Sequence, residues 1–158
     1  MTQITTIKDL WGSSRPYAAC FVVLRRGNSV AFVLRSNTEW MNGYYSLPAG
    51  KIEKGEGAVT GAVREALEEV GVTIDKKHLS HALTIHRKAD YEDMEWIDIY
   101  FEVSEWQGEP YNAEPNVHDE LVWLDLDQLP ENVVPVVRDA LQQIKAGNSY
   151  SEYGWDTN

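Results

Sequence analysis

An amphipathic repeat at positions 58–70 constrains the fold of this chain more than any other segment. Its apolar side chains recur every three or four residues, the spacing that places them on one face of an α-helix. They are Val59, Ala62, Val63, Ala66 and Val70, with Leu67 at the edge of the arc. Gly71 follows at the position where a left-handed helix cap costs little. The pattern predicts a helix that ends at Val70 and buries one face against another layer of structure.

The same helix carries a second face, made of Glu65, Glu68 and Glu69. Like charges at these spacings each destabilise a helix by a few tenths of a kcal/mol, and Arg64, the nearest cation in the sequence, can reach Glu68 but not all three. Such a face is often simply solvated. The alternative is that a divalent cation offsets the repulsion, because clustered carboxylates are hard oxygen ligands suited to Mg²⁺ or Mn²⁺.

Gly61 lies on this acidic face, four residues before Glu65. Alanine at this position would favour the helix by roughly 1 kcal/mol. We infer that the face needs space for an approaching group.

Strand-like runs surround this helix on both sides in the sequence. They cover positions 17–24, 30–35, 44–48, 79–87, 96–103 and 121–124, and a second helix is expected at 134–146. Gly27 and Asn28 form a hairpin-type turn between the first two runs. Because strands and helices interleave, the fold class is α/β or α+β with a mixed sheet. We expect one domain over residues 1–158, with a polar, aromatic-bearing tail from about 147.

The charge of the chain restricts its partners. Its 158 residues include 14 Lys+Arg and 25 Asp+Glu, which gives a net charge of −11. Such a surface repels a phosphate backbone and an anionic membrane, so neither a nucleic-acid polymer nor a membrane is an expected partner. A small polyanion could bind only where local cations or metals reverse the field. Protein partners are not indicated by the sequence.

The cysteine content and the N-terminal segment favour a cytoplasmic protein. Cys20 is the single cysteine and cannot form an internal disulfide. Residues 1–15 lack the apolar stretch of a secretory signal, and the longest apolar run, 17–24, is too short to cross a bilayer.

A longer pattern around the helix matches a known motif. Gly50 is followed after five residues by Glu56 and after seven more by the run 64–72, REALEEVGV. This arrangement resembles the Nudix box without a gap, with Ala66 and Val72 at its two aliphatic positions. At typical residue frequencies of about 5–8% a chance match is of order 10⁻⁸ per starting point.

The resemblance implies a fold, an activity and a cofactor. Proteins of this family resemble one another in an α/β/α sandwich, here with a mixed, curved sheet between helices. They hydrolyse a phosphoanhydride bond in a nucleoside di- or triphosphate derivative. Two or more Mg²⁺ ions, with Mn²⁺ as a substitute, would neutralise phosphate charge and activate water.

The resemblance also assigns roles to residues of the box. Glu65, Glu68 and Glu69 are similar to its metal ligands, and the Gly50 carbonyl to its backbone ligand. Either Glu65 or Glu68 would help to deprotonate the attacking water. Arg64 resembles the residue that orients a carboxylate, and Glu56 would support the loop.

A looser similarity extends to the MutT-type branch of this family. The run 106–110, WQGEP, is followed by Glu114, which resembles a further metal contact. A solvated loop acid is the alternative for Glu114. Arg35 and Lys51 resemble phosphate-binding positions of that branch. Arg35 can also be a simple charge at the end of a strand.

The substrate remains open between three possibilities. The MutT-type features favour conversion of a nucleoside triphosphate to the monophosphate and pyrophosphate, including oxidised purine nucleotides. The run 47–50, LPAG, resembles the form found in ADP-ribose-type enzymes, which favours hydrolysis of a nucleotide sugar or another nucleoside-diphosphate conjugate. A non-catalytic nucleotide sensor is the third possibility. Candidates for stacking on a base, each with core packing as the alternative, are Trp40, Tyr44, Trp106 and Trp123.

Overall fold

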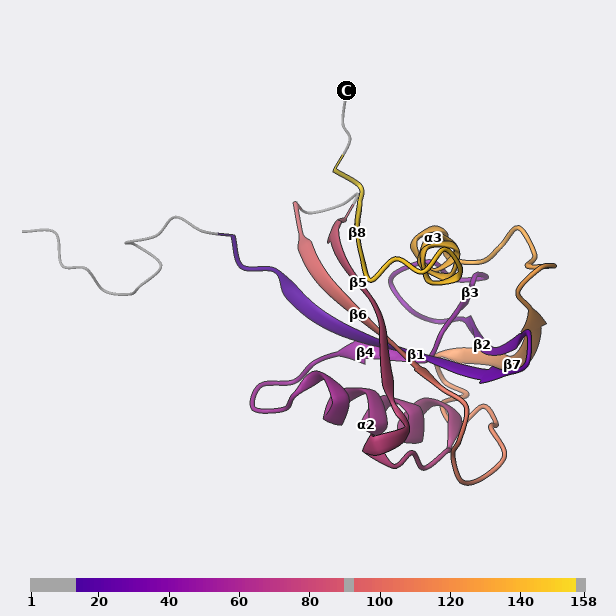
Figure 1. Cartoon of the computed structure of the whole chain (residues 1–158). Coiled ribbons are helices and arrows are strands. Elements are labelled where there is room, and N and C mark those ends of the chain that lie inside the picture. Colours follow the sequence, from indigo (N-terminus) through magenta and orange to yellow (C-terminus); the bar gives the residue numbers. More distant parts are fainter. Residues whose placement is uncertain (1–13, 90–92, 156–158) are drawn as a thin grey trace, which may run out of the picture.

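The computed structural model describes residues 14–89 and 93–155 and places a mixed sheet between two α-helices (Figure 1). The strands are β1 (Tyr17–Arg26), β2 (Ser29–Arg35), β3 (Tyr45–Ser46), β4 (Ala49–Lys51), β5 (Ser80–Lys88), β6 (Glu95–Val103), β7 (His118–Asp125) and β8 (Tyr150–Tyr153). The helices are α2 (Ala58–Val70), α3 (Pro135–Lys145) and the short 3₁₀ turn η1 (Lys76–His78). The expected layer arrangement is therefore confirmed. No helix in the described ranges is long and apolar enough to cross a membrane.

Strand β1 is the centre of the sheet. The strand order is β3-β2-β1-β6-β5-β8, with β4 also paired to β1 and β7 to β2. β1 runs parallel to β6 over Tyr17–Leu24 and antiparallel to β4 at Ala19–Phe21. It meets β2 at Arg25 and Arg26, where the predicted turn connects the two strands. This pairing brings β4, which carries Gly50, to the middle of the molecule.

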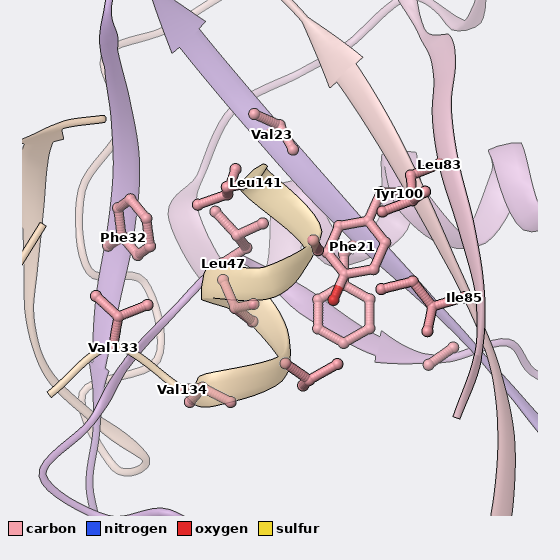
Figure 2. Packing of buried hydrophobic residues seen from close by; sticks show 14 of the residues in the cluster. Phe21, Val23, Phe32, Leu47, Leu83, Ile85, Tyr100, Val133, Val134 and Leu141 are labelled. Atoms are coloured by element: carbon pink, nitrogen blue, oxygen red, sulfur yellow. The ribbon is translucent and has the colours of Figure 1, made fainter. Parts of the chain in front are cut away.

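Apolar and polar residues do not alternate along β1, because a hydrophobic core covers each of the two faces of the sheet at this strand. Cys20, Val22 and Leu24 pack toward α2, whereas Phe21 and Val23 pack toward α3. Figure 2 shows the second core, in which the Phe21 ring stacks on Tyr100 with centroids 4.4 Å apart. Because both faces of β1 are covered, every residue from Ala19 to Leu24 is buried.

Helix α2 has the predicted ends but not the predicted orientation. Gly71 has φ of +70° and its N–H donates to the Leu67 carbonyl, as expected for a left-handed cap. The buried face is rotated toward the acidic arc, so Glu65 and Glu69 are 8% and 9% exposed, whereas Leu67 is 53% exposed. The prediction that the acidic residues form a face separate from the buried one was therefore wrong for Glu65 and Glu69.

Two strands lie where the sequence predicted none. The segment after position 48 was expected as a loop, yet Ala49–Lys51 forms β4. The polar tail forms β8, which pairs parallel to β5 from Thr84 to Arg87. Trp155 then donates its Nε1–H to the His86 carbonyl at 2.9 Å. The tail up to Trp155 thus belongs to the sheet layer.

Candidate active site

The contact between β4 and α2 forms the centre of the site. A Cβ atom on Gly50 would collide with the Glu65 carboxylate, so this carboxylate lies directly against the glycine backbone. The neighbouring Ala49 N–H donates to Glu69 Oε2 at 3.0 Å. Two glutamates of one helix are therefore packed onto one short strand, and only glycine permits the approach at position 50.

The buried glutamates are incompletely compensated. Burial, followed by the charge of Glu65, raises the pKa of Glu69 well above its usual range. Burial also raises the pKa of Glu65, against the opposing effect of Arg64. The protein therefore holds two carboxyl groups where their ionised forms are costly, and a cation would offset that cost.

Arg64 connects the helix to the loop that precedes it. Its Nη2 and Nε donate to the Glu56 carboxylate at 2.6 and 3.1 Å, and Nη2 also donates to the Lys51 carbonyl at 3.1 Å. Its Nη1 donates to Glu65 at 2.7 Å and to Glu68 at 3.2 Å. The hydrogen bond from Arg64 lowers the pKa of Glu56 to about 2. Arg64 thus fixes the loop and two of the helix carboxylates at once.

Glu114 reaches the same cluster from the loop before β7. The Ala113 N–H donates to the Glu69 carbonyl at 3.0 Å, which attaches this loop to the end of α2. Burial and then the charge of Glu68 raise the pKa of Glu114. The charge of Glu114 in turn acts on Glu65 and Glu69. The structure therefore places Glu114 close enough to the three helix glutamates for their charges to interact.

The space around Gly61 is filled by the protein itself. A Cβ at this position would lie 3.1 Å from Glu56 Oε1 and 3.3 Å from Cys20 Sγ. Both separations are tighter than ordinary van der Waals contact. The inference that this face needs space for an approaching group agrees with these contacts, and the approaching atoms belong to β1 and to the loop before α2.

The oxygen atoms of the carboxylate cluster are of the kind that binds a divalent metal ion, but the described side chains are not arranged as a set of metal ligands. Within residues 14–89 and 93–155, no group of three His, Cys, Asp or Glu side chains is arranged to hold an ion. Glu65 and Glu68 are engaged by Arg64, and Glu69 by the Ala49 N–H. Four carboxylates and the Gly50 carbonyl nevertheless supply the oxygen donors that Mg²⁺ and Mn²⁺ prefer.

A cavity of about 390 Å³ lies beside this cluster. It is lined by Ala19, Phe21, Arg35, Glu39, Trp40, Ser46, Ala49, Gly50, Lys51, Arg87, Met94 and Trp96. Arg35 is held by the Trp40 carbonyl at 3.0 Å and by Thr38 Oγ1 at 3.2 Å. The ammonium of Lys51 lies 5.2 Å from the centre of the Tyr17 ring. Both cations predicted to bind phosphate thus line the cavity that Gly50 borders.

Comparison with known proteins agrees with this geometry. The model of the NUDIX domain family matches residues 14–144. The chain belongs to the NUDIX domain family. It is a Nudix hydrolase, as the motif predicted.

Similar proteins cover most of this Nudix hydrolase. The 8-oxo-dGTP diphosphatase of Escherichia coli (strain K12) is 33% identical over 120 residues, 73% of this chain and 88% of that protein. The crystal structure of a MutT NUDIX hydrolase from Burkholderia pseudomallei has a TM-score of 0.75 and 25% identity, and covers 82% of this chain and 98% of that one. A MutT protein from Methanosarcina mazei has a TM-score of 0.72 at 21% identity, over 85% of this chain and 96% of that one, a likeness of fold alone.

The sequence reasoning about this Nudix hydrolase missed Arg87 on β5 and Trp96 on β6, which both line the cavity. It also missed Asp98 on β6, which does not line the cavity but pairs with Arg87. Asp98 has no exposed surface and accepts two hydrogen bonds from Arg87. The apolar alternation at positions 97, 99 and 101 puts Asp98 on the other face of the strand, so nothing in the sequence indicated that Asp98 is buried. The sequence also contained no signal that its partner is Arg87, eleven residues away on another strand.

The aromatic residues proposed for base stacking separate into two groups. Among the four, all within the described residues, only Trp40 lines the cavity. Trp106 and Trp123 instead stack on each other at 6.2 Å, with the Arg26 guanidinium 5.2 and 4.6 Å from their rings. These two rings therefore serve packing outside the cavity.

Proposed function

We propose that this Nudix hydrolase is a Mg²⁺-dependent pyrophosphohydrolase that converts a nucleoside triphosphate to the monophosphate and pyrophosphate. The observation that carries the proposal is the packing of Glu65 and Glu69 against β4, at the edge of a cavity lined by Arg35 and Lys51. The glutamate carboxylates therefore lie next to the cationic side chains of Arg35 and Lys51. This arrangement suits a metal ion bound by the carboxylates and phosphate groups bound by the cations.

In this proposal the carboxylates of Glu65, Glu68, Glu69 and Glu114 and the Gly50 carbonyl hold the metal. When bound, Mg²⁺ supplies charge neutralisation for the phosphate oxygens and lowers the pKa of bound water; Mn²⁺ would serve as a substitute.

The protein residues around that cluster would position the reactants. Glu65 or Glu68 accepts the proton of the attacking water, whose oxygen bonds to phosphorus as the bridging P–O bond breaks. Arg64 holds both carboxylates in place, and Glu56 holds Arg64. Arg35 and Lys51 would bind phosphate oxygens.

Oxidised purine nucleotides are the proposed substrate class. Two similar proteins support it, since the Escherichia coli protein and a Proteus vulgaris protein, 27% identical over 93 residues, are both named 8-oxo-dGTP diphosphatase. The alternative, a nucleotide sugar or related conjugate, rests on the LPAG run at 47–50.

A substrate panel tests the proposal. The full chain is incubated with Mg²⁺ and with nucleoside triphosphates, 8-oxo-dGTP and nucleotide sugars, and pyrophosphate and orthophosphate are measured separately. Pyrophosphate with monophosphate is expected, and EDTA should abolish its release. Orthophosphate release would overturn the proposed bond cleavage. Turnover of sugar conjugates alone would support the alternative, and binding without turnover would support a nucleotide sensor.

We further propose that residues 1–158 act as one catalytic domain in the cytoplasm on small-molecule nucleotides. The net charge of −11 opposes a nucleic-acid polymer as substrate.

A further inference from the structure

The cavity has a second end that the proposed chemistry does not use. Arg87 and Asp98 form an ion pair there, with Arg87 Nη2 3.2 Å from Asp98 Oδ1 and Arg87 Nε on Oδ2. The side chain of Arg87 is 11% exposed and that of Asp98 is not exposed at all. Arg87 lines the same cavity as Gly50 and Lys51.

The strand order sets the distance between the two ends. Lys51 on β4, Ala19 on β1, Asp98 on β6 and Ile85 on β5 are successive neighbours across the sheet. At about 4.8 Å per strand, the backbone of β5 lies about 14 Å from that of β4. The Lys51 ammonium and the Arg87 guanidinium both extend to the Trp96 ring between them, 5.7 and 5.2 Å from its centre. With the phosphates of a nucleotide beside β4 and α2, its base would extend across the sheet toward Arg87.

The ion pair leaves hydrogen-bond donors without acceptors. The Asp98 carboxylate accepts hydrogen bonds from Nε and Nη2 of Arg87. The Nη1 atom has no hydrogen-bond partner in the described part of the chain and is not among the buried atoms. The guanidinium lies 5.2 Å from the centre of the Trp96 ring. Trp96 Nε1 is itself buried and has no partner among the described residues. Because that indole nitrogen is enclosed, the donor that a ligand can reach is Nη1 of Arg87, and an Arg side chain, which can only donate, needs a ligand group that accepts hydrogen bonds.

Stability alone does not explain this pair. Replacing a buried ion pair by apolar side chains of similar volume is often neutral or stabilising. Here Asp98 fixes the guanidinium in one orientation beside the apolar walls formed by Phe21, Trp40 and Trp96. Aromatic walls favour a planar ring, and a fixed guanidinium favours a ring edge with acceptors.

The chemistry of purines then distinguishes two kinds of substrate. A guanine-type base presents O6 as an acceptor, which arginine recognises, whereas adenine presents an amino donor at the same position. We propose that Arg87, oriented by Asp98, is a specificity-determining residue that selects purine nucleotides with a carbonyl oxygen at C6 over those with an amino group. This inference rests on the proposed function, because it assumes that the phosphates lie beside β4.

Steady-state kinetics with GTP, ITP and ATP at fixed Mg²⁺ test the inference. ITP lacks the 2-amino group of GTP, so ITP and ATP differ only at the C6–N1 edge, where ITP presents a carbonyl oxygen and an N1–H and ATP presents an amino group and an unprotonated N1. The intact protein should prefer GTP and ITP. Arg87→Met should reduce that preference about tenfold or more, mainly through KM, and Arg87→Lys should restore part of it. An equal loss for all three nucleotides would assign Arg87 to phosphate binding or to structure and would overturn the inference.

Two further variants keep the test interpretable. Arg87→Met leaves Asp98 buried and unpaired, so the double variant Arg87→Met/Asp98→Leu removes both charges and should show the same loss of preference in a folded protein. Arg25→Met is the matched control, because Arg25 pairs with Glu102 on the same sheet but does not line this cavity. It should leave the preference unchanged, and the same loss in Arg25→Met would overturn the inference.

Binding measurements separate failure of this inference from failure of the proposed function. Non-hydrolysable analogues of the three nucleotides are titrated calorimetrically against the intact protein and Arg87→Met. A preference for the C6 carbonyl that depends on Arg87 supports the inference even if no nucleotide is hydrolysed. Hydrolysis without that dependence in either assay would overturn the inference and leave the proposed function intact.

Discussion

Replacing Glu69 by glutamine should stabilise the metal-free protein at neutral pH. Glu69 is 9% exposed, and the one hydrogen bond that its side chain makes within the described residues comes from the Ala49 N–H at 3.0 Å. A buried, poorly compensated polar group costs about 1–3 kcal/mol, and a charged one more. Glutamine keeps an acceptor for Ala49 but loses the extra strength of a charge-assisted bond, about 1 kcal/mol. The net gain is about 1 kcal/mol or more, which corresponds to a rise in Tm of about 2–4 °C.

The pH dependence of this gain has a definite sign. Burial raises the folded-state pKa of Glu69 above its ordinary value of 4.5. The stability that the protonated glutamate provides is therefore complete below pH 4.5 and is lost as the pH rises through the folded-state pKa. Glutamine does not titrate, so the advantage of Glu69→Gln should be largest above that pKa and disappear below pH 4.5.

Urea unfolding in EDTA, followed between pH 4 and pH 8, measures this difference. Glu68→Gln is the matched control, because the Glu68 side chain is 49% exposed and its removal should change stability by less than about 0.5 kcal/mol. Added Mg²⁺ should stabilise the unsubstituted chain more than Glu69→Gln, because the variant lacks a ligand. A metal-free Glu69→Gln that is less stable at pH 7 would show that the protein already compensates this charge, and would refute the reasoning.

Three further substitutions probe the packing of the site. Gly50→Ala places a Cβ against the Glu65 carboxylate, so we expect a loss of about 1–3 kcal/mol in urea unfolding and weaker Mg²⁺ binding by calorimetry; unchanged metal affinity would contradict this. Gly61→Ala gains about 1 kcal/mol of helix propensity but crowds Glu56, so thermal unfolding should show no net gain, and a clearly more stable variant would be inconsistent with the packing. Arg64→Lys loses the two-point contact with Glu56, and kcat should fall about 10–100-fold with little change in KM; full activity would remove the positioning role.

The spacing of residues along the chain was sufficient to predict α2 and the motif that it carries. Helix ends depend on local periodicity and on the cap, and Gly71 adopts the positive φ that such a cap requires. The family followed from the same local spacing, because Gly50, Glu56 and the glutamates of α2 lie within one continuous segment. The apolar run at 17–24 likewise predicted a strand, which the structure shows as β1.

The burial of side chains and the pairing of strands could not be predicted, because they depend on which helix or strand packs against the segment. The wheel of α2 shows which residues share an arc, but the packing of β4 decides that Glu65 and Glu69 turn inward while Leu67 is exposed. The spacing indicated that Gly61 needs room around it, but not that Cys20 and Glu56 fill that room, since both lie outside the helix. β8 carries no strong apolar alternation, and its pairing with β5 supplies the hydrogen bonds that make it a strand.

The sequence by itself therefore determined the family, the hydrolase class and the set of glutamates, because short-range spacing along one helix encodes them. Only the tertiary structure decided which of those glutamates are buried, that the loop carrying Glu114 is attached to the end of α2, and that Arg87 on β5 pairs with Asp98 on β6 beside the cavity. These relations join residues on separate strands and loops. These relations arise from the order of the strands in the sheet and from burial, and the residue pattern within a single segment predicts neither of the two.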